Sequence, residues 1–177
     1  MTFNPVLSLR LAAAATALGV AFLAGGCSAP EGKRSIDGTP PTMALYNAPP
    51  KILQSDDDKK AAGVNAIVGW HAELRTAEGA SGKTLGYCNG TMLITRSSAV
   101  DDEDEHRMTM IEFDWDDSND SLVVGGAHPY LSTQTESRTP IVRAIFGGTG
   151  RFVGSMGQVV STPLPSGWYR HDIWLVD

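Results

Sequence analysis

Two carboxylates, Glu112 and Asp114, stand two residues apart in a segment where apolar and polar residues alternate. In a β-strand, such residues point to the same face and lie about 7 Å apart. If that face lines an apolar cavity, the two groups raise each other's pKa and can exchange protons or stabilise a cation. If it faces solvent, they are ordinary surface acids. The sequence leaves both alternatives open.

Arg143 is a cation in apolar surroundings. Ile141 and Ile145 lie two residues away on its own face, and a charge among apolar side chains needs a partner. Two partners are conceivable, Glu112 in a salt bridge or the carboxylate of a bound ligand. If the fold holds a ligand, we expect both Arg143 and Glu112 to face its interior, where removing one member of a buried pair costs roughly 3 to 5 kcal/mol.

Other polar residues offer weaker signals. Tyr87 and Asn89 share a face of a second apolar run. The four histidines, at positions 71, 106, 128 and 171, lack the short spacing of metal ligands. Segment 114–120 has acidic residues but lacks the glycine and the glutamate of a calcium loop, so an acidic hairpin turn is favoured. We expect no metal and no cofactor.

The elements that must position these residues are strands. β-Branched and aromatic runs are broken at short intervals by Gly, Asp, Asn and Pro, without a helical period. The expected runs are 66–74, 84–95, 107–115, 121–129, 140–146, 153–161 and 168–176. Seven or eight antiparallel strands predict a barrel or a sandwich. The chain of 177 residues has a formal net charge of -6 and no Lys/Arg cluster, which argues against nucleic-acid binding.

The N-terminal segment has the layout of a targeting signal. Arg10 precedes the apolar run 11–23, which is short for a membrane-spanning helix of about 20 residues. Small residues then lead into Cys27, an arrangement that resembles the lipobox of bacterial lipoproteins, in which the cysteine is acylated. We therefore expect a signal peptide at 1–26 and a bacterial envelope lipoprotein anchored through Cys27, facing the periplasm or the exterior. Ordinary cleavage a few residues later is the alternative.

Residues 27–63 are rich in Pro, Gly, Ser and charge, and this composition predicts a tether. Within it, residues 43–46 could dock on the domain, which we place at 64–177. Lipid on Cys27 would leave Cys88 without an intrachain partner, since the chain has two cysteines. Cys88 is then either a small buried hydrophobe or a reactive thiol.

Several segments of the domain resemble the allene oxide cyclase and dirigent superfamily. Residues 121–129 resemble the dirigent strand that ends in a Gly-x-x-Pro turn, and residues 145–152 resemble the Gly-Gly-Thr-Gly hairpin with its aromatic residue. Residues 154–159 are similar to the next strand of allene oxide cyclases. Residues 85–91 have the glycine spacing of the second dirigent strand.

This resemblance implies an antiparallel eight-stranded barrel that forms a homo-oligomer such as a trimer and binds a small apolar ligand in its open end. It implies an isomerase or cyclase that works without a cofactor by holding a reactive ligand in one conformer. Glu73 lies where dirigent proteins carry an acidic catalytic residue, although no paired Asp follows. The candidate catalytic residues are Glu112, Arg143, Tyr87, Asn89 and Glu73. The alternative is a non-catalytic binding or structural module of the cell envelope.

Overall fold

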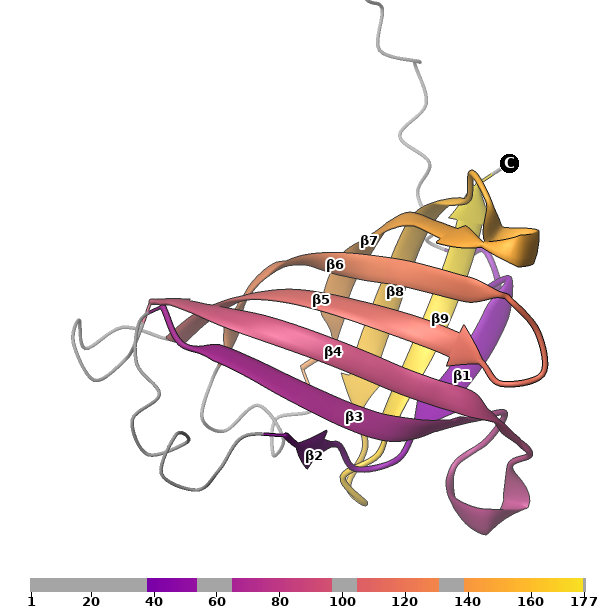
Figure 1. Ribbon diagram of the computed structural model, residues 1–177, viewed down its shortest axis with the longest axis horizontal. Coiled ribbons are helices and arrows are strands. Elements are labelled where there is room, and N and C mark those ends of the chain that lie inside the picture. Colours follow the sequence, from indigo (N-terminus) through magenta and orange to yellow (C-terminus); the bar gives the residue numbers. More distant parts are fainter. Residues whose placement is uncertain (1–37, 54–64, 97–104, 131–138, 177) are drawn as a thin grey trace, which may run out of the picture. The chain divides into compact units, whose positions relative to one another are not determined.

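The computed structural model describes residues 38–53, 65–96, 105–130 and 139–176. Strands of these ranges join into a single antiparallel sheet, and two short 3-10 helices lie in its turns (Figure 1). In chain order the elements are β1 (Met43–Asn47), β2 (Lys51–Ile52), β3 (Ile67–Arg75), η1 (Gly79–Ser81), β4 (Thr84–Arg96), β5 (Glu105–Trp115), β6 (Ser121–Tyr130), β7 (Ile141–Thr149), η2 (Gly150–Phe152), β8 (Met156–Pro163) and β9 (Tyr169–Val176).

The sheet closes on itself. Hydrogen-bonded neighbours follow the order β1-β9-β8-β7-β6-β5-β4-β3, and β1 then pairs with β3 through Tyr46 opposite Arg75 and Asn47 opposite Leu74. The short strand β2 pairs with the N-terminal half of β3, at Trp70 and His71. Figure 1 shows β3 to β7 as one wall, with β8, β9 and β1 crossing behind it. The predicted antiparallel eight-stranded barrel is confirmed, and closure excludes the sandwich.

The barrel begins earlier than the sequence predicts. Residues 43–46, expected to dock on a domain that starts at 64, belong to β1, which is hydrogen-bonded to β9 and β3 as a strand of the wall. Its alternation places Leu45 in the interior at 4% exposure. Flanking Pro and Gly residues obscured so short a strand. The expected signal peptide and residues 27–37 and 54–63 of the expected tether, including Cys27, lie outside the described residues.

One half of the barrel interior is packed with apolar side chains. Alternate residues of each strand point inward, as the pattern of β5 predicts, where Ile111, Phe113 and Trp115 are buried. Cys88 belongs to the same core and is fully buried. Burial raises the pKa of the Cys88 thiol well above its usual range, so the thiol stays protonated and the buried-hydrophobe interpretation holds.

The turn between β7 and β8 is close to the one expected from its glycines. A Cβ at Gly148 would lie 2.1 Å from the carbonyl oxygen of Ser121, so only glycine lets β7 approach β6 there. Phe152 in η2 is buried and packs on Trp115, with ring centroids 5.0 Å apart. This contact caps the packed half of the barrel. Within the described ranges, no helix is long and apolar enough to cross a membrane.

Candidate functional site

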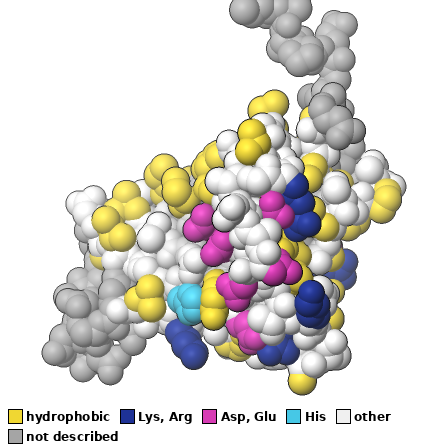
Figure 2. Space-filling model, turned by 45° about the vertical axis from the view of Figure 1, so that its right-hand side comes forward, with side chains coloured by type: hydrophobic (Ala, Val, Ile, Leu, Met, Phe, Trp, Pro, Cys, Tyr) yellow, Lys and Arg dark blue, Asp and Glu magenta, His cyan; other side chains and the backbone are white. Residues whose placement is uncertain are grey.

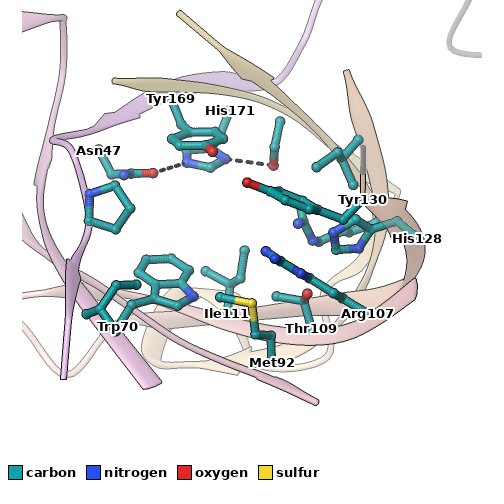
Figure 3. A pocket seen from close by; sticks show the side chains of 15 residues that line it. Asn47, Trp70, Met92, Arg107, Thr109, Ile111, His128, Tyr130, Tyr169 and His171 are labelled. Carbon is teal, nitrogen blue, oxygen red and sulfur yellow. Dashed lines mark hydrogen bonds between the residues drawn. The ribbon is translucent and has the colours of Figure 1, made fainter. Parts of the chain in front are cut away.

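The other half of the barrel encloses a cavity of about 100 Å³ (Figure 3). It lies toward the end of the barrel where β4, β6 and β8 finish and β5, β7 and β9 begin. The lining residues are Asn47, Pro50, Ile52, Trp70, Met92, Arg107, Thr109, Ile111, His128, Tyr130, Ile141, Arg143, Ser161, Tyr169 and His171. Inward-facing positions of eight strands and the segment after β1 therefore converge on one space.

The indole of Trp70 forms part of the apolar wall, and it depends on a glycine. Trp70 in β3 is directly opposite Gly90 in β4. A Cβ added to Gly90 would lie 2.1 Å from the indole, so a side chain there would force the ring to move. Met92 and Ile111 lie beside the ring on the same side of the cavity in Figure 3. The absence of a side chain at position 90 thus shapes this wall.

Three polar side chains form a hydrogen-bonded chain across β1, β8 and β9. The Asn47 Nδ2 donates to the carbonyl oxygen of Ala48, which leaves Oδ1 as the acceptor for the Nε2–H of His171 at 2.6 Å. The other ring nitrogen, Nδ1, lies 2.8 Å from the Ser161 hydroxyl and accepts from it. All three residues are buried. The network fixes one neutral tautomer of His171.

The pKa of His171 agrees with this arrangement. Burial, and secondarily the charge of Arg143, lowers it to about 3. Because both ring nitrogens are already engaged, a second proton on the ring would force the Ser161 hydroxyl to turn from donor to acceptor. His171 is therefore a neutral, positioned part of the wall and not a general base working near neutral pH.

Arg143 reaches the cavity from β7 and is only 7% exposed. Its Nε has no hydrogen-bond partner, and none of the ion pairs among the described residues involves it. Loss of solvation lowers the pKa of Arg143 to about 10, against smaller opposing effects of Tyr169 and Cys88. The guanidinium remains charged at neutral pH and has no carboxylate partner within the described part of the chain.

A second cation, Arg107, stands at the rim and is already engaged. Its guanidinium lies over the ring of Tyr130, 3.4 Å from the centroid, and its Nε pairs with Glu105. In Figure 3 the Tyr130 hydroxyl and the Arg107 guanidinium both point toward the cavity. Burial, and then Arg143 and Arg107, lowers the pKa of His128 to about 4, against a smaller opposing effect of a hydrogen bond with the Gly126 backbone. Among the residues that the structure describes, the cavity thus holds one unpaired positive charge.

Four of the five predicted site residues lie outside this cavity. Glu112 is opposite Asn89, on the face of the sheet that also carries the exposed Met110. The expectation that Glu112 faces the interior is wrong, and so is its salt bridge to Arg143. In the alternation of β5, the inward positions belong to Ile111 and Phe113, which leaves Glu112 and Asp114 outside. Figure 2 shows acidic side chains gathered on one outer face.

Tyr87, Asn89 and Glu73 are on the outer surface as well. His71 Nδ1 is hydrogen-bonded to the Asn89 Oδ1 at 2.8 Å, and its ring packs on Tyr87 with centroids 4.6 Å apart. The structure brings Asn89 and Glu112 together in an open, shallow depression of the outer wall.

The carboxylate of Glu73 accepts hydrogen bonds from Arg75 and from the Thr84 hydroxyl, and these bonds lower the pKa of the carboxyl. Of the five candidates, Arg143 alone lines the cavity. The sequence analysis did not identify two cavity tyrosines, Tyr130 and Tyr169, or the Asn47–His171–Ser161 chain. Two-residue spacing on β9 could have indicated Tyr169 and His171, which share a face of the last run.

No known protein family matches the sequence, and no curated protein is similar to it. Solved structures are similar in fold. A pyocyanin demethylase superposes with a TM-score of 0.52 at 18% identity, over 76% of this chain and 98% of that chain. The pterocarpan synthase dirigent protein gives 0.53 at 14% identity, over 75% and 83%.

A Diels–Alderase from Streptomyces koyangensis superposes with a TM-score of 0.51 at 14% identity, over 75% of this chain and 59% of that chain. The fold of this chain is therefore shared by proteins whose names describe different chemistry. At these identities the likeness shows the fold alone. The chain has a barrel like those of dirigent and cyclase proteins, and the resemblance inferred from sequence is confirmed at that level.

Proposed function

We propose that the barrel binds a small, largely apolar ligand in the cavity and steers its cyclisation or isomerisation without a cofactor. The observation that carries the proposal is the cavity itself, a space with apolar walls and a few converging polar groups at the end of a packed barrel. Ligand sites in proteins have this composition. The similar folds of a dirigent protein and a Diels–Alderase support the same reading.

The residues of the cavity would act by shape and charge. Trp70, Met92 and Ile111 offer flat and flexible apolar surface that can select one conformer of a ligand. Arg143 can stabilise an oxygen on which negative charge develops, because its guanidinium is held in a site with little water. Tyr130 and Tyr169 provide hydroxyl donors. Burial raises the pKa of Tyr169, which keeps that hydroxyl protonated.

Two neighbouring residues of β7 provide the test. Ile141 lines the cavity and is buried, whereas Val142 faces outward and is 57% exposed. We expect indole, a small neutral probe, to bind the wild type in isothermal titration calorimetry. Ile141→Trp should fill the cavity and abolish binding, while Val142→Trp should leave it intact. Equal binding by both variants, or none by the wild type, would contradict the proposal.

A non-catalytic binding or structural module is the second candidate, and the size of the cavity favours it. The volume of about 100 Å³ is below the roughly 300 Å³ at which ligand pockets usually begin. The predicted acids, Glu112 and Glu73, also lie outside the cavity. The compound that copurifies with the wild type and not with Ile141→Trp decides between the candidates. A cyclase would convert it to an isomer of the same mass, and a binding module would return it unchanged.

The location remains a separate proposal. We propose that the chain is carried to a bacterial envelope and acylated on Cys27, with the barrel on the periplasmic or exterior side. The support is the Arg10 start, the short apolar run and the small residues before Cys27. Labelling with radioactive palmitate should mark the wild type and not Cys27→Ser. Label that survives this substitution would overturn the proposal.

A further inference from the structure

The guanidinium of Arg143 is buried without a counter-charge from the residues that the structure describes. It is 7% exposed, and its Nε lacks a hydrogen-bond partner among the described residues. A buried charge normally has a partner, because leaving water costs several kcal/mol. The predicted partner, Glu112, faces the other side of the wall. The partner position inside the barrel is therefore unfilled by the described chain.

The charged and titratable side chains of the cavity lining also lack an acid among the described residues. The described residues of this lining include two arginines and two histidines but neither Asp nor Glu. Arg107 is neutralised by Glu105, and the pKa values of His128 and His171 are lowered by burial and by Arg143, so both rings are neutral. Among the described lining residues, one net positive charge remains, on Arg143.

We propose that the ligand of this cavity carries a carboxylate, which forms an ion pair with Arg143 while the apolar body of the ligand lies against Trp70 and Ile111. This inference rests on the proposed function and names the ligand class for the same site. It also explains why the barrel keeps a charge that is unfavourable in the empty protein: the carboxylate supplies the missing counter-charge.

A carboxylate suits the site better than a phosphate. Its single charge equals the single unpaired charge of Arg143, and its two oxygens match the fork of a guanidinium. A phosphate brings nearly two charges and a strongly held water shell into a cavity of about 100 Å³ whose second arginine is already paired. Most of the lining surface is apolar, which fits the body of an organic acid.

The test compares probes of equal shape and different charge. Benzoate and benzamide differ in the charge of one group, and inorganic phosphate serves as the anion without an apolar body. In calorimetric titrations of the full chain, we expect benzoate to bind at least tenfold more tightly than benzamide. Arg143→Met should remove this preference and leave benzamide binding. Arg170→Met, which removes an outer arginine paired with Asp172, should leave the preference intact.

The possible failures are distinct. Equal affinities for benzoate and benzamide would overturn the carboxylate inference and leave the proposal of an apolar ligand standing. Phosphate binding that depends on Arg143, without benzoate binding, would overturn the carboxylate inference in favour of another anion. If neither ring compound nor indole binds the folded wild type, the proposed function fails together with the inference.

Discussion

Replacement of Arg143 by methionine should stabilise the protein. Burial lowers the pKa of Arg143 well below its ordinary value, to about 10, and each pKa unit corresponds to about 1.4 kcal/mol. Holding the guanidinium charged inside the barrel therefore costs about 3 kcal/mol. Methionine keeps most of the apolar stem and carries no charge. After allowing about 1 kcal/mol for lost packing, we expect the free energy of unfolding to rise by about 1 to 3 kcal/mol.

Urea denaturation followed by circular dichroism measures this change directly. A matched substitution, Glu112→Gln, should change the free energy of unfolding by about 1 kcal/mol or less, because that side chain lies on the outer wall. The double variant should show additive effects, since Arg143 and Glu112 face opposite sides of the sheet. Destabilisation of roughly 3 to 5 kcal/mol by Arg143→Met would refute the reasoning, because a loss of that size means that the arginine has an internal partner.

Further predictions concern the histidines, the apolar wall and assembly. Above pH 6.5 neither the folded nor the unfolded chain protonates His128 and His171, whereas below it the unfolded chain gains protons that the folded one excludes. Stability should therefore fall by up to about 1.4 kcal/mol per pH unit for each histidine down to about pH 4; urea midpoints that stay constant from pH 7.5 to 5 would contradict this. Gly90→Ala should destabilise by about 1 to 3 kcal/mol and alter the near-ultraviolet circular dichroism of Trp70, while Gly69→Ala, whose Cβ would meet only ordinary contacts, should not. Multi-angle light scattering should give a mass that is a multiple of the monomer's, and a monomer would rule out the expected self-association.

The sequence predicts the barrel well because the relevant signal is local. Alternation of Ile111, Phe113 and Trp115 marks a half-buried strand, and Gly148 permits the close approach of two strands that its motif implies. The same alternation places Glu112 on the opposite face from Ile111. It does not say which of the two faces lines the interior of the barrel. The structure decides this through the burial of the apolar set.

The cavity network is harder to predict because its members are far apart in sequence. Asn47 and His171 are 124 positions apart, and they meet only because β1 pairs with β9 to close the barrel. Ser161 joins them across one further strand. Arg143 is the exception, since its two isoleucine neighbours already indicate a buried cation. The sequence does not show that Glu112 of β5 fails to supply the counter-charge of Arg143.

Methyl NMR during titration with benzoate tests most directly whether the interior of the barrel is the ligand site. Isoleucine and methionine methyls report separately on the two faces of the wall: Met92, Ile111 and Ile141 line the cavity, whereas Met108 and Met110 are exposed on the outside. We predict saturable shifts of the three cavity methyls and constant positions of the two outer ones. Shifts confined to Met108 and Met110, or no saturable shift at any of the five, would contradict the account.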